Sequence, residues 1–523
     1  NFKERLTIID TQLFTSVYCA VAPGMLSADR MCFAMTLALL RIHGSDLDVE
    51  HHEVTEFLRG GSLYGGDKGA FESLVNDEIM TEGGAAQAHK LSGLLDAFKP
   101  LLSNINSQKA SVKNWINDAK AEESMPELVD NGKNDTEKMI RELLLLQIFR
   151  PDRVEPKSKL FVARCLGDAF LATADAAEFT DFVDGEDPKT PFLLGGVTGY
   201  DPSANVMKFA ASKGMSVQPI AIGSAQGFVQ AKSAIDNGQR TGKWVILTNV
   251  HLAPKWLDTL AKELEGSSPH AKFRLFLTSD ISPKLPNSLI RIARVFVFEP
   301  PQGIQASLLR TLRSFPDDAM NKQPKERSKL YFLLAWLHAV IQERLRYAPL
   351  GWSKVYEFGE PDLRASEWTI ASWMDAGPQV GSIKPETIPF EALQTLLTQA
   401  IYGGRIGNMV DARMLQSFVE SVITEKAFTS NDFALVKAVG GDKAIEVPYH
   451  SNKQQFMEWA SKLTSVQLPS WIGLPNMAER VLLANRARDL VNKMNLLQTV
   501  GGDEKFESFA PGSEASSGTP GWM

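Results

Sequence analysis

The sequence has few cysteines and no long apolar run. Its 523 residues include 3 Cys, at Cys19, Cys32 and Cys165, with no CxxC pair and no spacing typical of metal ligands. Disulfide frameworks and zinc sites need such groupings, so neither is expected, and no metal site is predicted. The most apolar stretch, 330–341, contains His338 and is shorter than the roughly 18 residues of a membrane span. We therefore expect an intracellular protein without membrane contact, in which this stretch is a buried helix.

An excess of basic residues is also missing. Lys plus Arg number 55 against 62 Asp plus Glu, a net charge of −7. Such a balance repels a phosphate backbone unless a basic face is segregated, and no basic block occurs. Nucleic acid is therefore not an expected partner, and direct binding of an acidic filament by these residues is disfavoured. The first residues, NFKERLTIID, contain neither an initiating Met nor an apolar signal core, as expected of a chain that begins in mid-protein.

Apolar spacing divides the chain into four regions. Helical spacing interrupted at Pro23-Gly24, and a polar run at 121–138, predict a helical region over 1–137. Short apolar runs alternate with helical stretches over 138–301, which is typical of a mainly parallel sheet covered by helices. Long helical patterns return over 302–500, and the Gly-, Ser- and Pro-rich tail 501–523 is expected to be a flexible linker or truncated end. The expected fold class is α/β plus all-α.

Five strands are predicted in the α/β region. They are PFLLGG (191–196), VQPIAIG (217–223), KWVILTNV (243–250), FRLFLTSD (273–280) and ARVFVFEPP (293–301). Each is a short apolar run bounded by Gly, Pro or polar residues.

The loop after the first predicted strand departs from the phosphate-binding pattern. A loop of the form GxxxxGK[ST] holds phosphates with backbone N–H groups and neutralises them with its lysine. The degenerate loop here is made up of Gly195, Gly196, Gly199, Tyr200, Asp201 and Pro202. Neither possible register, counted from Gly195 or from Gly196, contains a lysine. Asp201 would repel phosphate and Pro202 removes a backbone donor, so binding of Mg-ATP is not expected.

A second catalytic element is missing from the predicted strand 243–250. An ATPase ends this strand with an acidic residue that positions Mg²⁺ and the attacking water. Thr248 and Asn249 stand there instead, and Asn can neither supply the charge nor act as a base. Lys243, in the sequence TGK, precedes a strand rather than opening a helix, so it is interpreted as a solvated turn. No catalytic residue and no cofactor are expected in this segment.

Three long stretches resemble the sixth AAA+ module and lid of dynein heavy chains. They are AIGSAQGFVQAKSAIDNGQRTGKWVILTNVHLAPKWL (221–257), FRLFLTSDISPKLPNSLIRIARVFVFEPP (273–301) and YFLLAWLHAVIQERLRYAPLGWSKVYEFGEPDLR (331–364). IYGGRI (401–406) and PSWIGLPNMAERVL (469–482) continue the resemblance. The sequence of 331–364 is closer to that of cytoplasmic than of axonemal dyneins. The N-terminal helices, ERLTIIDTQLFTSVYCAVAPGML (4–26) followed by CFAMTLALL (32–40), resemble the segment that joins the fifth module to the sixth.

The resemblance implies an AAA+-type P-loop core with a parallel sheet and a degenerate nucleotide site over 138–301, and a helical AAA+ lid over 302–500. It implies a non-catalytic ring segment that relays conformational change in a minus-end-directed, ATP-driven microtubule motor, with ATP and Mg²⁺ bound by other modules. The alternative is a self-contained AAA+ ATPase with a divergent phosphate loop.

The same resemblance implies partners and a location. The partners are the other AAA+ modules of the same heavy chain, a second heavy chain, intermediate and light-intermediate chains, and microtubules reached through a stalk that this segment lacks. The location is the cytoplasm, on the microtubule cytoskeleton.

Two arginines and two histidines remain to be interpreted. Arg291 and Arg294 follow LPNSLI, where an AAA+ module places an arginine finger. Because the family leaves the neighbouring site empty, a contact between modules is favoured over catalysis, and Arg suits bidentate pairing there. His251 and His338 have no ligand partner at metal spacing, so hydrogen-bonded structural roles are expected.

Overall fold

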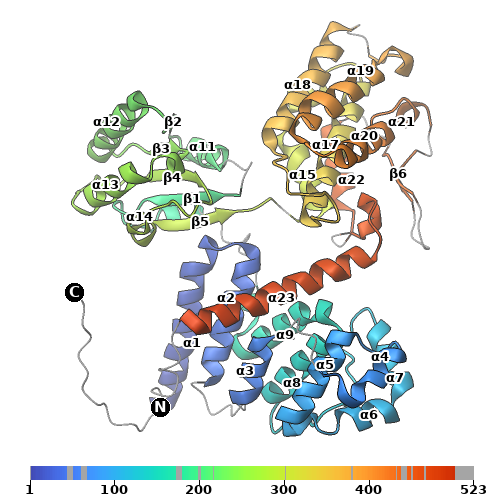
Figure 1. Ribbon diagram of the computed structural model, residues 1–523. Coiled ribbons are helices and arrows are strands. Elements are labelled where there is room, and N and C mark those ends of the chain that lie inside the picture. The colour runs from blue at the N-terminus through green and yellow to red at the C-terminus, as the bar shows by residue number, and fades with distance from the viewer. Residues whose placement is uncertain are drawn as a thin grey trace. The chain divides into compact units, whose positions relative to one another are not determined.

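The chain folds into two compact units (Figure 1). The first contains residues 1–22, 27–176 and 481–523, and the second contains residues 23–26 and 177–480. The computed structural model describes residues 2–43, 51–60, 67–171, 180–197, 202–215, 217–300, 302–377, 381–430, 433–437, 444–448, 452–464 and 467–500. The tail 501–523, for which a flexible linker is predicted, lies outside these residues.

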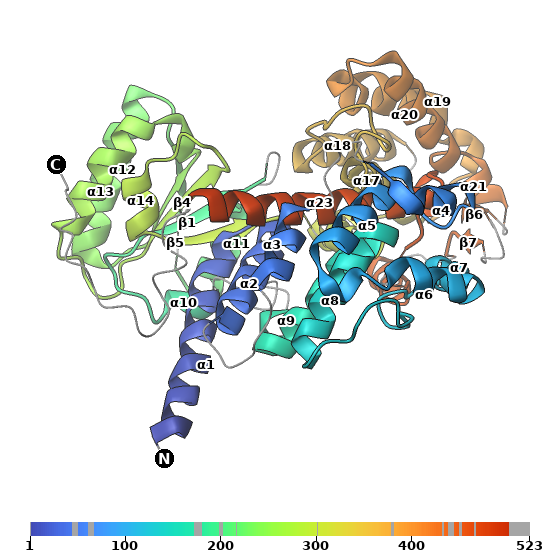
Figure 2. The same ribbon diagram turned by 60° about the horizontal axis from the view of Figure 1, so that its bottom comes forward.

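The first unit is helical. Its helices are α1 (Phe2–Val21), α2 (Ser27–His43), α3 (His51–Arg59), α4 (Glu72–Asn76), α5 (Glu82–Leu94), α6 (Leu101–Ser107), α7 (Lys109–Asn117), α8 (Asp135–Phe149), α9 (Val154–Leu166) and most of α23 (Met477–Val500). The two helices predicted before residue 41 are confirmed, separated by the turn Ala22–Gly24. One core joins α8, which is buried over most of its length, to α23 through Leu490, Val491 and Met494 (Figure 2). Most of α23 therefore belongs to this unit and not to the predicted helical lid.

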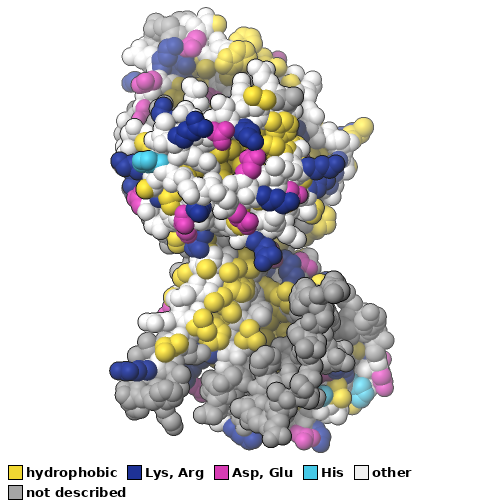
Figure 3. Space-filling view, turned by 90° about the vertical axis from the view of Figure 1, so that its left-hand side faces the viewer, with side chains coloured by type: hydrophobic (Ala, Val, Ile, Leu, Met, Phe, Trp, Pro, Cys, Tyr) yellow, Lys and Arg dark blue, Asp and Glu magenta, His cyan; other side chains and the backbone are white. Residues whose placement is uncertain are grey.

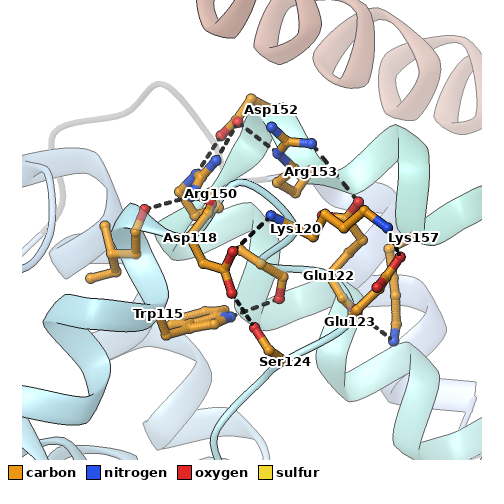
Figure 4. A network of polar contacts seen from close by, with 12 residues as sticks. Trp115, Asp118, Lys120, Glu122, Glu123, Ser124, Arg150, Asp152, Arg153 and Lys157 are labelled. Carbon is orange, nitrogen blue, oxygen red and sulfur yellow. Dashed lines mark hydrogen bonds and ion pairs between the residues drawn. The ribbon is translucent and has the colours of Figure 1, made fainter. Parts of the chain in front are cut away.

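The polar run 121–138 is packed inside the first unit (Figure 4). The Trp115 indole N–H donates to the Ala121 carbonyl at 2.7 Å, and Arg150 donates to the carbonyl of Asp118, just before the run, at 2.9 Å. Lys157 of α9 donates to the Glu122 carbonyl at 3.3 Å. These bonds satisfy loop carbonyls that would otherwise be buried without partners. The predicted boundary at 137/138 therefore lies within one compact unit, because the loop is tied to helices on both sides of it.

All five predicted strands are present in the second unit and form one parallel sheet. They are β1 (Phe192–Gly196), β2 (Pro219–Ala221), β3 (Val245–Thr248), β4 (Leu275–Asp280) and β5 (Arg294–Phe298), in the order β2-β3-β4-β1-β5. The helices of this region are α10 (Thr180–Val183), α11 (Ser203–Ser212), α12 (Ala225–Thr241), α13 (Pro254–Glu265) and α14 (Asn287–Ile292).

Successive residues of the strands enter different cores on the two faces of the sheet. Leu193 and Leu277 pack with α12, α13 and α14, whereas Phe192, Leu194 and Phe276 pack with α10 and α11. Because strand side chains alternate between faces, an apolar run of this kind requires helices on both sides. Figure 1 shows this layered arrangement.

The rest of the second unit is the predicted helical lid, with one small hairpin that the sequence did not indicate. Its elements are α15 (Ile304–Ser314), α16 (Asp317–Asn321), α17 (Glu326–Arg346), α18 (Glu360–Ala376), α19 (Phe390–Thr395), α20 (Met409–Val422), α21 (Lys426–Thr429), β6 (Ala434–Val436), β7 (Ile445–Glu446) and α22 (Lys453–Ser461). The apolar stretch 330–341 is buried in α17, as predicted. Among the described residues, no helix is long and apolar enough to cross a membrane.

Two lid positions have structural roles, and that of His338 was predicted. His338 is buried, and its Nδ1 lies 2.9 Å from the Tyr402 hydroxyl, so this histidine is a hydrogen-bonded core residue. Gly403 follows a π-helical turn, Leu396–Ile401, and a Cβ atom at Gly403 would lie 1.6 Å from the Thr398 carbonyl oxygen. Only glycine permits so close an approach between two backbone segments.

Candidate functional site at the carboxyl edge of the sheet

The carboxyl ends of β1, β3 and β4 meet at one edge of the sheet, where open α/β sheets bind ligands. Gly196, the last residue of β1, is in register with Asp280 of β4 and with Phe298 of β5. Its carbonyl accepts the Ile281 N–H at 3.1 Å, and the next residue, Val197, donates to the Phe298 carbonyl at 3.3 Å. Gly195 and Gly196 are buried. The degenerate loop therefore leaves the sheet from an inner strand, between β4 and β5.

The loop ends at the start of α11, so its two described ends join a strand to a helix as a phosphate loop does. Gly199, Tyr200 and Asp201 lie outside the described residues. Pro202 immediately precedes Ser203, the first residue of α11, and its carbonyl accepts the Asn205 N–H at 3.1 Å. Pro202 has no N–H of its own to offer a phosphate. The position of the site is thus that of a phosphate loop, whereas its chemistry is different.

Thr248 and Asn249 serve the backbone at the end of β3. The Thr248 hydroxyl points to the Ile220 carbonyl of β2 at 3.5 Å, and the Thr248 carbonyl accepts the Ile222 N–H at 3.0 Å. Asn249 has left-handed torsions, φ 59° and ψ 38°. Asn adopts this conformation more readily than most residues. The left-handed backbone of Asn249 therefore turns the chain out of the sheet.

An acidic residue that the sequence reasoning missed also stands at this edge. Asp280 ends β4 opposite Gly196, and its side chain is 46 % exposed. The Asp280 backbone N–H donates to Nδ1 of His251 at 3.1 Å, and His251 Nε2 lies 3.9 Å from the Asp280 carboxylate. His251 is therefore hydrogen-bonded, as predicted. The signal for Asp280 was its place at the end of a predicted strand, but only the strand order brings it beside the loop.

A small cavity lies where β1 ends. Its volume is about 50 Å³, and it is lined by Val197 and Pro300 together with lid residues that include Arg310, His338 and Glu360. Pockets that hold drug-sized ligands occupy roughly 300–1,000 Å³, whereas one water needs only about 10–15 Å³. This cavity has room for a few waters.

The two candidate arginines have different surroundings. Arg294, at the start of β5, places its guanidinium 4.8 Å from the centre of the Phe182 ring, and its Nε lies 3.7 Å from the Glu186 carboxylate. Both contacts are within its own α/β core. Arg291 is exposed in the last turn of α14. Of the two, Arg291 has the placement that a contact with another module requires.

Lys243 has the surroundings expected of a turn. Lys243 is exposed and follows Gly242, whose φ of 75° ends α12, so the TGK sequence is a turn and not a phosphate loop. Within the described ranges, no three or more His, Cys, Asp or Glu residues are grouped so that they could hold a metal ion.

Comparison with known proteins identifies two matching families. The family described as "Dynein heavy chain region D6 P-loop domain" matches residues 187–297, and "Dynein heavy chain AAA lid domain" matches residues 327–478. The dynein heavy chain, cytoplasmic, of Drosophila melanogaster is 41 % identical over 543 residues, which cover 100 % of this chain and 11 % of the relative. The protein of the same description from Caenorhabditis elegans is 37 % identical over 533 residues, covering 100 % and 11 %. The chain therefore spans about a tenth of the length of these relatives.

Proposed function

The chain belongs to the cytoplasmic dynein heavy chain family and covers its D6 P-loop domain and AAA lid, and from this premise we propose that the segment itself binds no nucleotide. In this proposal it is a non-catalytic part of the ring of a minus-end-directed, ATP-driven microtubule motor. It relays conformational change that nucleotide binding and hydrolysis cause in other modules. ATP and Mg²⁺ belong to those modules.

One observation is the main support for the proposal that the segment binds no nucleotide. The strand-to-helix position of a phosphate loop is present between Gly196 and Ser203, but neither register of GGVTGYDPS contains a lysine. Nearly all of a phosphate loop's affinity comes from backbone donors and that lysine. Asp280 at the same edge of the sheet adds a negative charge where phosphates would lie.

The relay is supported by the stiffness of the lid. Buried Asp411 of α20 accepts the Ser353 N–H at 3.1 Å and the Tyr356 hydroxyl at 2.7 Å. Buried Arg344 of α17 donates to the carbonyls of Gly351 and Ile472. These bonds join segments that are far apart in the sequence. A displacement at one end of a body held in this way reaches its other end, which is what a mechanical relay requires.

The partners follow from the same proposal. Within the heavy chain they are the neighbouring AAA+ modules. For the whole protein they are a second heavy chain, intermediate and light-intermediate chains, and microtubules bound through a stalk outside this segment, in the cytoplasm.

Calorimetric titration with Mg-ATP and with Mg-ADP tests the absence of nucleotide. We expect no binding heat up to millimolar nucleotide. Binding at micromolar concentration would overturn the proposal and favour the alternative, a self-contained AAA+ ATPase with a divergent phosphate loop. Lys243→Ala is the matched control, because it removes the lysine of the TGK turn and leaves the degenerate loop unchanged.

A second experiment uses the intact heavy chain. Asn249→Gly keeps the left-handed backbone and removes the polar side chain, so we expect microtubule-stimulated ATP turnover to be unchanged. In a working module, loss of the residue that positions the attacking water would reduce turnover by orders of magnitude. A large loss of turnover in Asn249→Gly would contradict the non-catalytic role.

A further inference from the structure

Ser124 stands in an acidic turn between α7 and α8. Glu122 and Glu123 precede it, Glu127 follows three residues later, and no Lys or Arg occurs over 121–132. Ser124 is exposed, and the residues directly after it, 125–128, have no regular secondary structure. A surface groove of about 410 Å³ opens beside it, lined by Ser111, Asn114, Trp115, Asn117, Asp118 and Ser124. The serine is therefore open to a large reactant.

The sequence around Ser124 fits a known kind of phosphoryl acceptor. Acid-directed serine kinases modify a serine that has Asp or Glu three residues later, because their substrate groove is lined with basic side chains. Ser124, Ser233, Ser372 and Ser417 are exposed and meet this condition, but the last three lie within α12, α18 and α20. A kinase takes its substrate as an extended segment, so a helical serine must first unwind, whereas a loop opens at little cost.

The charges around a helical serine can also disfavour such a kinase. Lys232 directly precedes Ser233, and Figure 3 shows acidic and basic side chains interspersed on the face of the α/β core that carries α12. Basic neighbours are repelled by a basic substrate groove. Ser124 combines a loop conformation with charged neighbours in sequence that are all acidic.

We propose that Ser124 is the acceptor site of an acid-directed serine kinase, and that its phosphorylation opens the turn 118–124. In the transfer, the Ser124 oxygen bonds to the γ-phosphorus of ATP, the bond from that phosphorus to the bridging oxygen breaks, ADP leaves, and the hydroxyl proton is released. The inference goes beyond the proposed function and does not depend on it, because the ATP is bound by the kinase and the degenerate loop takes no part.

The opening follows from the contacts of Asp118 (Figure 4). One oxygen of its carboxylate accepts the Lys120 backbone N–H at 3.0 Å, and the other accepts the Ser124 hydroxyl at 2.7 Å. These bonds hold the pKa of Asp118 below its usual range, so the group is ionised at neutral pH. Phosphorylation removes the hydroxyl donor and places about two negative charges against this carboxylate. The nearby Lys120 ammonium is already paired with Glu123 at 3.0 Å.

The same turn attaches the run 121–138 to α7. The Ala121 carbonyl, which accepts the Trp115 indole N–H at 2.7 Å, lies between Asp118 and Ser124 in the chain. Repulsion between a phosphate on Ser124 and Asp118 therefore strains this attachment as well. The expected result is a loop that is released from the helix before it.

Phosphopeptide mass spectrometry of the intact heavy chain, incubated with Mg-ATP and a purified acid-directed serine kinase, tests the acceptor site. We expect Ser124 to be modified at least about tenfold faster than Ser233, Ser372 or Ser417, because the helical serines must unwind. Equal rates at the four serines would overturn the assignment of the acceptor.

A pair of variants tests the recognition of Ser124. Glu127→Gln removes the charge three residues after the serine and keeps a carbonyl for the Asn131 side chain, which donates to Glu127 at 3.0 Å. It should slow modification of Ser124 by at least about tenfold, whereas Glu123→Gln, the same change before the serine, should slow it by less than about threefold. A Glu127→Gln chain modified as fast as the wild type would overturn the proposed recognition.

Hydrogen exchange tests the opening of the turn. After phosphorylation, the amides of 118–124 should exchange at least about tenfold faster, and those of α20 should not change. Ser124→Ala is the control, because it loses the same hydrogen bond without adding charge, and its exchange should rise by less than about threefold. Unchanged exchange on phosphorylation, or an equal rise in Ser124→Ala, would overturn the opening by charge repulsion.

Discussion

Rebuilding the phosphate loop tests why we expect the segment to bind no nucleotide. It distinguishes the missing lysine of the loop from the small volume of the cavity at the end of β1. Counted from Gly196, the motif GxxxxGK[ST] requires Gly at 201, Lys at 202 and Ser or Thr at 203, and Ser203 is already present as the first residue of α11. The double substitution Asp201→Gly with Pro202→Lys therefore completes the motif. The start of the loop keeps its place, because Gly196 is held by β4 and β5.

The expected gain in affinity for Mg-ATP follows from the added charge. A lysine ammonium about 4 Å from a phosphate oxygen interacts by about 4 kcal/mol at an effective dielectric constant of about 20. Ordering the lysine side chain and removing water from it cost about half of this, and loss of the Asp201 charge contributes on the order of 1 kcal/mol. The net gain of about 3 kcal/mol is an increase in affinity of roughly 100-fold. A wild-type Kd of about 10 mM would therefore fall to about 100 μM.

Calorimetry with Mg-ATP measures the change, and Asp201→Gly with Pro202→Gln is the matched control. The control removes the same two residues but adds no charge, so it should gain less than about tenfold. Neither variant should hydrolyse ATP, because Thr248 and Asn249 supply no carboxylate at the end of β3. A folded lysine variant that bound no better than its control would refute the reasoning. The cause would then be the small cavity at the end of β1 and not the chemistry of the loop.

Three further predictions concern the lid. Gly403→Ala should lower the free energy of unfolding in urea by about 3 kcal/mol or more, because its Cβ would overlap a backbone carbonyl, whereas Gly404→Ala, with nothing within 4 Å, should change it by less than about 0.5 kcal/mol. Burial lowers the pKa of His338 to about 3, so between pH 6.5 and 3 the unfolded chain binds the proton and stability falls. Between pH 7 and pH 5, the free energy of unfolding of His338→Gln should therefore fall by about 2 kcal/mol less than that of the wild type. Burial alone would raise the pKa of Asp411, but hydrogen bonds from Ser353 and Tyr356 outweigh it and hold this pKa below its usual range. The contribution of ionised Asp411 to the free energy of unfolding is present above about pH 4 and is lost on further acidification. In urea unfolding, Asp411→Asn should therefore be about 2 kcal/mol less stable than the wild type at pH 7, and this difference should shrink below pH 4.

Several features of the fold could be predicted because their cause is local. The strands of the sheet are short apolar runs with polar or glycine boundaries, and helix and strand periods differ enough to be distinguished along the chain. The loss of the phosphate loop is a matter of residue identity, since no arrangement of GGVTGYDPS supplies a lysine. The structural role of His338 followed from the lack of any ligand at metal spacing, and its hydrogen bond with Tyr402 fits that prediction.

Other features depend on residues that are distant in the sequence. Asp280 stands beside the degenerate loop only because the sheet places β4 next to β1. Arg294 is held within its own core because Phe182 and Glu186, from a different element, face it. The left-handed backbone of Asn249 is a property of the turn that leaves the sheet. No local period or motif encodes these neighbours.

The sequence alone determined the five strands of the parallel sheet, which family the chain resembles and which catalytic residues it lacks, because these depend on residue type and on spacing within a single segment. The tertiary structure alone decided where the compact units divide. The run 121–138 resembles a linker by composition, yet hydrogen bonds from Trp115 and Lys157 tie it into the first unit. The end of α23 leaves the lid for that same core. Whether a segment is buried depends on the residues that pack against it as much as on its own composition, and those residues lie elsewhere in the chain.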